Sequence, residues 1–220
     1  MNTFNKILSR VTLVLGVTFM SAFQLYADDW KEIMYADPTI FVENGKYYLT
    51  GTRNQEPQGF AILESTDLEH WTVPDGTSLQ LILRKGDQTY GEKGFWAPQY
   101  FKDKRTYYFT YTANEQTVIA SSKSVFGPFR QKEVKPVDAS AKNIDSFLFK
   151  DDDGKYYLYH VRFNKGNYLW VAEFDIKKGS IKPETLKQCM DCTEPWEKTP
   201  NYKSAPVMEG PTVMKWDGVY

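Results

Sequence analysis

The apolar and polar positions of the chain follow one pattern four times. Each copy has an apolar, aromatic-rich stretch, a short polar turn and the opening of a second such stretch. Short apolar stretches rich in Tyr, Phe and Val, bounded by Gly, Asn and Asp, are typical of β-strands. Each copy therefore predicts a strand, a turn and the start of a second strand, and the copies begin at Asp37, Ala97, Asp145 and Gly210.

The turn residues support these hairpins. Asn-Gly and Asp-Gly reach positive φ at little cost and close two-residue hairpins, and they occur here as Asn44-Gly45, Asp153-Gly154 and Asp217-Gly218. After each of the first three copies comes another apolar run and then a polar turn. We expect these runs, at 60–63, 117–120 and 168–172, to be third strands that lead toward a fourth.

The spacing of the copies predicts the fold class. Their starts are 48 to 65 residues apart, which is the size of a four-stranded propeller blade. A β-sandwich would also give many short strands, but it would not explain one hairpin motif that returns at blade-sized intervals. We predict an all-β propeller. The fourth copy reaches Tyr220 inside its hairpin, so we expect this chain to hold about three and a half blades and to be incomplete at its C-terminus.

Composition narrows the class of function. Hydrophobic residues make up 41% of the chain and aromatic residues 16%, enough to bury a core. With 27 Lys and Arg against 28 Asp and Glu, the formal net charge is −1. The chain therefore has no net positive charge to attract a polyanion, and we expect no nucleic acid partner. The aromatic rings favour strands, and they also serve as surfaces on which sugars stack.

The N-terminus has the pattern of a targeting segment. Lys6 and Arg10 precede an apolar run at 11–23, and small residues up to Ala27 follow. This order is typical of a cleaved secretory signal, and the run is too short to cross a bilayer comfortably. We predict a signal peptide at 1–27, a catalytic domain at 28–220, a secreted or periplasmic location, and no membrane association after cleavage. A retained membrane anchor is the alternative.

No resident metal or redox centre is predicted. Cys189 and Cys192 lack the second ligand pair that a zinc site requires, and both a small loop disulfide and two free thiols stay open. The run 151–154 is acidic, but the distal Glu of an EF-hand is missing and a hairpin turn explains it. We expect His70 in a solvated turn and His160 packed in a strand, neither of them catalytic.

The propeller geometry nominates a site. The first strands of the blades line the central channel in the same direction, so their first residues meet at one mouth. That position holds Asp37, Asp145 and, next to Gly210, Glu209, while Trp96 precedes Ala97. Glycoside hydrolysis needs paired carboxylates, and aromatic walls bind sugar faces. Each acid by itself would be read as an ordinary turn residue; the repeat is what brings them together.

Trp96 and its neighbour Phe95 are the candidates for the apolar wall of the sugar site. Packing in the core is the alternative for both residues.

As a set, the blade-opening motifs resemble the family 43 glycoside hydrolases. The resemblance covers residues 28–220 and includes the blade-end segments 65–71 and 127–129. It implies a five-bladed propeller and an inverting hydrolase acting on arabinose-, xylose- or galactose-containing glycans, with the rest of blade four and blade five missing from this chain. The motifs that carry it are Asp37-Pro38, Trp96-Ala97-Pro98, Ile144-Asp145-Ser146 and Glu209-Gly210-Pro211.

The resemblance also implies the roles of the acids. Asp37 would be the general base that activates water, Glu209 the general acid, and Asp145 the residue that tunes and orients Glu209. Inversion needs the two catalytic carboxyl groups about 6.5–9.5 Å apart, with water between base and sugar. No cofactor is implied, and a channel calcium ion stays open, with its histidine ligand in a later blade outside this chain.

Two other functions stay open, and both would act on an oligosaccharide or polysaccharide partner. One is a carbohydrate-binding propeller without catalysis. The other is a retaining, fructan- or sucrose-cleaving relative, although the Glu-Gly-Pro context of Glu209 speaks against that group.

Overall fold

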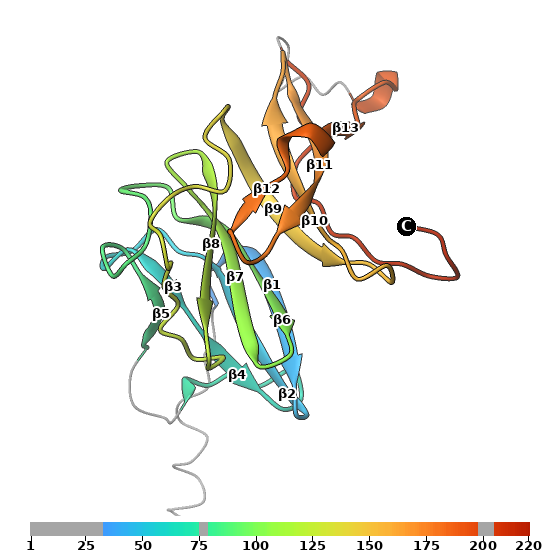
Figure 1. Ribbon diagram of the computed structural model, residues 1–220. Coiled ribbons are helices and arrows are strands. Elements are labelled where there is room, and N and C mark those ends of the chain that lie inside the picture. The colour runs from blue at the N-terminus through green and yellow to red at the C-terminus, as the bar shows by residue number, and fades with distance from the viewer. Residues whose placement is uncertain (1–32, 75–78, 198–204) are drawn as a thin grey trace, which may run out of the picture.

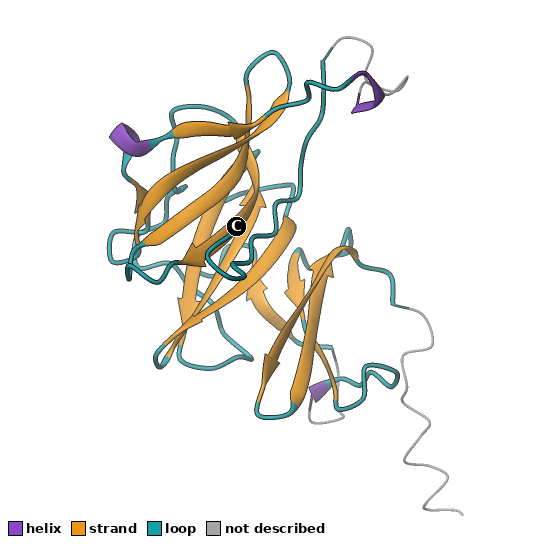
Figure 2. Cartoon of the chain, turned by 90° about the vertical axis from the view of Figure 1, so that its right-hand side faces the viewer, coloured by secondary structure: helices purple, strands orange, loops and turns teal. Residues whose placement is uncertain are grey.

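The computed structural model describes residues 33–74, 79–197 and 205–220. The predicted signal segment lies outside these ranges. Nearly all regular structure is β-strand, arranged as separate sheets that fan out from one another (Figures 1 and 2). The helical elements whose full bounds are described are the short 3-10 turns η2 (Pro183–Thr185) and η3 (Pro195–Glu197), and a search of the described residues finds no helix that could cross a membrane. The prediction of an all-β propeller type is confirmed.

The first blade begins with an antiparallel hairpin. It consists of β1 (Ala36–Glu43) and β2 (Lys46–Thr52), and β4 (Leu63–Ser65) pairs with the other edge of β2. The predicted third strand at 60–63 is divided, because β3 (Gly59–Ala61) leaves this sheet to pair with β5 (Leu81–Arg84). Ile62 lies between the two pieces and is buried.

The second and third blades follow the predicted plan. The second contains β6 (Trp96–Asp103), β7 (Thr106–Ala113) and β8 (Gln116–Ser122) in antiparallel order. The third contains the longer strands β9 (Asn143–Lys150), β10 (Tyr156–Phe163) and β11 (Asn167–Asp175), and both β12 (Ser180–Ile181) and β13 (Lys187–Met190) pair with β11.

Two of the three predicted turns have the expected form. Asn44 and Gly45 have φ of 52° and 75°, and Asp217 and Gly218 have φ of 47° and 79°, so both pairs make two-residue turns with positive φ. The prediction for Asp153-Gly154 was wrong. The β9–β10 connection spans 151–155, with positive φ at Gly154 but not at the preceding Asp. Its extra acidic residues lengthen the loop, and a Gly in the left-handed region is the usual way to close such longer hairpins.

The fourth copy does not form the predicted strands. Residues 205–220 contribute isolated bridges, from Val207 to Asn167 and between Trp216 and Val219. This C-terminal segment runs beside the third blade (Figure 1), and the ring of Tyr220 packs edge-on against Phe149. A strand needs a neighbour joined by backbone hydrogen bonds, and among the described residues, 211–215 form none.

The first strands of successive blades lie next to one another, as a propeller requires. β1 contacts β6, and β6 contacts β9. The main core joins the first two blades and is dominated by aromatic rings that meet edge-on or stacked, Phe60, Phe95, Phe109 and Tyr111. Burial of such rings supplies most of the stabilisation of a sheet protein of this composition.

A repeated polar contact joins each blade to the next at the hairpin end of the first strand. An acid at the end of this strand accepts hydrogen bonds from a Lys and a Tyr in the following copy. The acid–Lys pairs also form ion pairs, and Lys150 lowers the pKa of Asp103. The three sets are Glu43 with Lys102 and Tyr107, Asp103 with Lys150 and Tyr156, and Asp151 with Lys215 and Tyr220.

The third set explains the acidic run at 151–153. Lys215 lies 2.7 Å from Asp151 and 2.9 Å from Asp152. The run therefore anchors the fourth copy to the third blade through an ion pair.

Candidate active site

The site is built on a backbone irregularity repeated in every copy. Asp37, Ala97 and Asp145 have φ of 47°, 45° and 49°, and Gly210 has 67°. In β1, β6 and β9 the strand register shifts at this residue, which marks a bulge. A non-Gly residue in the left-handed region costs about 1–2 kcal/mol. Bulges re-aim side chains, and here each one lies at the blade-opening position that the sequence nominated.

The structure brings the three predicted acids into electrostatic contact. Burial is the main reason that the pKa of Asp145 is raised, to about 6. The charge of Glu209 and then that of Asp37 raise it further, while a hydrogen bond from the backbone N–H of Gly210 opposes them. Asp37 comes from the first blade, Asp145 from the third and Glu209 from the fourth copy. Carboxylates 64 to 172 residues apart in the chain therefore influence one another's charge.

Asp37 is held by a residue that sequence reasoning missed. The hydroxyl of Thr52 donates a hydrogen bond to Asp37 Oδ2 at 2.6 Å. The hydroxyl oxygen of Thr52 also accepts a hydrogen bond from the backbone N–H of Ala97 at 2.8 Å. Thr52 is buried, whereas Asp37 is exposed. One hydroxyl thus fixes the first acid and joins the first blade to the second.

The second blade uses the same device. Thr112 has the same place in β7 that Thr52 has in β2, and its hydroxyl accepts the backbone N–H of Asp145 at 3.1 Å. The third copy has Val161 there, which cannot accept. Extending the alignment of the repeats to the ends of the second strands would have revealed both threonines.

Glu209 has a different neighbour. Its Oε1 accepts a hydrogen bond from the side-chain amide of Asn167. The backbone of Asn167 also fixes the segment just before Glu209. Its N–H donates to the carbonyl of Pro206 at 2.9 Å, and its carbonyl accepts from the N–H of Met208 at 2.9 Å. Asn167 was not predicted, and it lies outside the repeated motif.

The two aromatic candidates face opposite ways. Trp96 is 38% exposed and its ring lies over the backbone of Gly94. Phe95 is 4% exposed and stacks on Tyr111 within the main core. Phe95 therefore has the packing role that was its alternative, and it presents no surface to a sugar.

The remaining sequence candidates are structural. His70 is exposed and pairs with Asp67 at 2.7 Å, while His160 is packed in β10, where burial lowers its pKa to about 4. Both cysteines are free thiols. Within the described ranges no group of three or more His, Cys, Asp or Glu residues could hold a metal ion.

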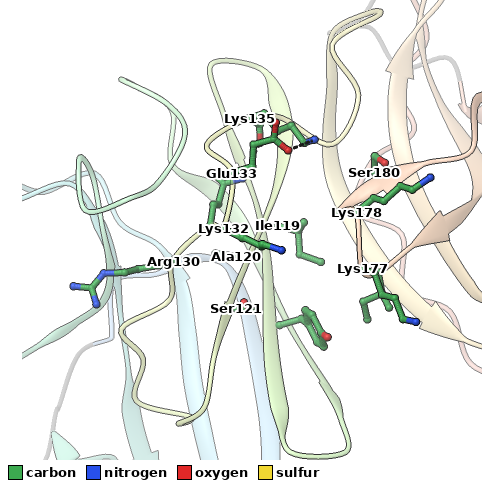
Figure 3. Close-up of a pocket in the computed structure, with 14 residues that line it drawn as sticks. Ile119, Ala120, Ser121, Arg130, Lys132, Glu133, Lys135, Lys177, Lys178 and Ser180 are labelled. Atoms are coloured by element: carbon green, nitrogen blue, oxygen red, sulfur yellow. Dashed lines mark hydrogen bonds and ion pairs between the residues drawn. The ribbon is translucent and has the colours of Figure 1, made fainter.

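Two grooves lie between the second and third blades. The larger, about 690 Å³, has cationic side chains from two segments on its walls, among them Lys132, Lys177 and Lys178 (Figure 3). None of the three acids lines it. The smaller, about 440 Å³, is lined by Asn167, which donates to Glu209, and by Asn143, which is two residues before Asp145; none of the three acids lines it.

Comparisons with known proteins agree with this geometry. The family model described as glycosyl hydrolases family 43 matches residues 31–220. The chain is 28% identical over 190 residues to the extracellular endo-alpha-(1->5)-L-arabinanase 1 of Bacillus subtilis (strain 168), covering 80% of this chain and 57% of that protein. It is 29% identical over 199 residues to a xylosidase/arabinosidase of Butyrivibrio fibrisolvens, covering 84% and 36%.

A solved structure is similar as well. The endo-1,4-beta-xylanase from Bacteroides thetaiotaomicron VPI-5482 superposes with a TM-score of 0.74 at 39% identity, covering 84% of this chain and 60% of that one. The chain thus spans less than two thirds of the length of each of these relatives. The family model, the relatives and the repeated bulge at the acids lead to one conclusion: the chain belongs to the glycosyl hydrolases of family 43.

Proposed function

We propose that the whole protein is an exported, inverting glycoside hydrolase that cleaves arabinose- or xylose-containing glycans. The observation that carries this proposal is the shared field of Asp37, Asp145 and Glu209 at the blade-opening bulges. Galactose-containing glycans, which the sequence resemblance also implies, are the third substrate class in this proposal. The names of the arabinanase, the xylosidase/arabinosidase and the xylanase support the choice of arabinan- or xylan-type substrates.

In this proposal Asp37 removes a proton from the attacking water. Its carboxylate is oriented by the Thr52 hydroxyl and is exposed to solvent, which gives water access to it. Glu209 donates a proton to the leaving glycosidic oxygen from the other side of the sugar. Trp96 offers an exposed indole face for the sugar ring.

Asp145 keeps a proton within the acidic cluster. Because burial and the two neighbouring carboxylates raise the pKa of Asp145 to about 6, its carboxyl group does not become fully ionised until the pH passes that value. Below that pH, a protonated Asp145 adds no second negative charge beside Glu209 and can orient its carboxyl group.

Export is part of the proposal. The pattern of residues 1–27 supports it, and the arabinanase relative is described as extracellular.

The roles of Glu209 as acid and Asp37 as base can be distinguished by comparing substrates whose leaving groups do and do not need a proton. Glu209→Gln should lower kcat on arabino- or xylo-oligosaccharides about 10³-fold, because general acid catalysis contributes roughly 10²–10⁴. The same variant should recover most of its rate on a 2,4-dinitrophenyl glycoside, whose leaving group needs no proton. Asp37→Asn should be slow on both substrates, because water must be activated in each. Rates would be measured by release of reducing sugar and of dinitrophenolate.

Glu133→Gln is the matched control, since it removes a carboxylate from the other groove. Undiminished hydrolysis by Glu209→Gln would end the assignment. NMR of the first product decides inversion: the anomer opposite to that of the substrate is expected, and a retained anomer would favour the fructan-type alternative. Binding of oligosaccharides without any hydrolysis would favour the non-catalytic carbohydrate-binding propeller.

A further inference from the structure

The smaller groove, about 440 Å³, has the size of a small-molecule site and opens beside Glu209. One wall comes from the end of β10 and the start of β11, with Phe163 and Asn167. The rest of the lining includes Glu115 in the β7–β8 turn and Lys142 and Asn143 where β9, the strand that pairs with β10, begins. All of these residues lie at the end of the blades that carries the acids.

The groove lies on the side of the general acid. Asn167 lines it and also donates to Glu209, and Asn143 is two residues before Asp145. None of the lining residues comes from β1, the strand that carries Asp37. In an inverting reaction the acid and the water-activating base work on opposite faces of the sugar, and the leaving group departs on the side of the acid. The groove is therefore placed to receive the leaving group.

The lining fits a neutral sugar. Phe163 is 61% exposed, and an exposed aromatic ring is the surface on which sugar faces stack. Two other lining residues, Lys142 and Glu115, form an ion pair at 2.5 Å. Because these two charges compensate each other, the rim offers polar atoms to hydroxyl groups and no net charge to a uronic acid.

The part of the lining that Asn143 forms is firmly held. Asn143 is buried, and its side-chain amide donates to the carbonyls of Ala141 at 2.7 Å and Asp138 at 2.8 Å. Its backbone N–H donates to Glu115 at 3.0 Å. A wall that is already ordered loses little entropy when a ligand binds.

We propose that this groove is the subsite for the first sugar of the leaving chain, with Phe163 as its stacking platform. The inference rests on the proposed function and deepens it. It assigns the protein a preference for oligomeric and polymeric glycans over glycosides with a minimal leaving group, because only a leaving sugar fills the groove.

The test compares two substrates in the complete protein. One is arabinopentaose or xylopentaose, whichever the protein hydrolyses, and the other is the corresponding glycosyl fluoride, whose leaving group is a single atom. Phe163→Ala should lower kcat/KM on the pentasaccharide about tenfold, the upper range for one aromatic contact, and change the rate on the fluoride less than about twofold. Phe163→Trp keeps a stacking surface and should retain activity on both.

Phe126→Ala is the matched control, since Phe126 is also an exposed Phe but does not line the groove. An equal loss on both substrates in Phe163→Ala, or no loss on the pentasaccharide, would overturn the subsite.

Titration calorimetry with both pentasaccharides, in the Glu209→Gln background so that neither is hydrolysed during the titration, separates this inference from the proposed function. Binding that weakens when Phe163→Ala is added, while the wild-type protein hydrolyses neither pentasaccharide, would support the groove and refute the hydrolase. Binding that is identical with and without Phe163→Ala would refute the groove and leave the hydrolase standing.

Discussion

At the residue scale, the hydroxyl of Thr52 connects catalysis to architecture. It donates to Asp37 at 2.6 Å and accepts from the backbone of Ala97 at 2.8 Å. A hydroxyl with one donor and two acceptor sites can satisfy both contacts at once. Thr112 makes only the second kind of contact, with the backbone of Asp145. The chain thus contains a pair of threonines that differ in whether they bind a carboxylate side chain.

We predict that Thr52→Val lowers kcat about tenfold with little change in KM, because the orientation of the base matters in the transition state more than in the ground state. Thr52→Ser keeps the hydroxyl and should restore most of kcat. Steady-state kinetics on an oligosaccharide substrate would measure both.

Thr112→Val separates the two contacts of Thr52. Both valine variants should lose about 1 kcal/mol of unfolding free energy, because each gives up one bond to the next blade. The kcat loss of Thr52→Val should be the larger one. A wild-type kcat in Thr52→Val would show that its hydroxyl serves the blade contact alone.

At the element scale, the blade-opening bulge costs stability wherever its residue is not glycine. The fourth copy has Gly210 at this position, whereas the second has Ala97 at a φ of 45°. Ala97 has no side-chain chemistry that would require it there. Asp37 and Asp145 hold the same conformation and contribute their carboxylates to the site, so strain at these two positions accompanies proposed function.

We predict that Ala97→Gly stabilises the protein by up to about 1 kcal/mol, because glycine adopts the left-handed region without the steric cost that alanine has. Urea denaturation of the complete protein would measure the free energy of unfolding. Ala120→Gly is the control: Ala120 lies buried in β8 without a positive φ, so it should destabilise by about 1 kcal/mol. Equal destabilisation by the two substitutions would contradict a strained bulge.

At the scale of the whole molecule, packing the blades around one axis gathers negative charge. Asp145 is partly buried among carboxylates from two other copies. Its pKa of about 6 in the folded state lies above the ordinary value of 3.8. A group whose pKa rises on folding contributes stability that is fully present below the unfolded value and is lost as the pH rises through the folded value.

We predict that Asp145→Asn is more stable than wild type at pH 7.5, by up to about 3 kcal/mol, since one pKa unit corresponds to about 1.4 kcal/mol. As the pH falls to 3.5 the difference should almost vanish, because Asp145 is then protonated in the folded chain and mostly protonated in the unfolded chain. The variant should also lose activity. Urea denaturation at the two pH values would measure the difference.

Comparing variant with wild type removes the contributions of other carboxylates. Asp103 has a lowered pKa, mainly through Lys150, and the pKa of Asp151 is lowered to about 2, mainly through Lys215. These groups contribute stability above the unfolded pKa that is lost at low pH, the opposite sign to Asp145. A stability difference between Asp145→Asn and wild type that does not change with pH would show that the acidic cluster carries no strain.

By itself, the sequence determined the blades and the position of the acids. Strand alternation and turn dipeptides are local properties, encoded within about 10 to 15 residues, and the return of one motif is visible in the sequence without any structure. Together they predicted β1, β2, β6, β7, β9 and β10. Because equivalent positions in a propeller meet at one mouth, the repeat also placed Asp37, Asp145 and Glu209 together before any coordinates.

Only the tertiary structure decided what depends on contacts between distant segments. The sequence offered Phe95 and Trp96 alike for the sugar site, and the aromatic core at Phe60 and Tyr111 decides that Phe95 is the buried one. The bond from Thr52 to Ala97 spans 45 residues, and the bond from Asn167 to Glu209 spans 42. Local propensity carries no information about such partners, because they exist only once the blades have packed.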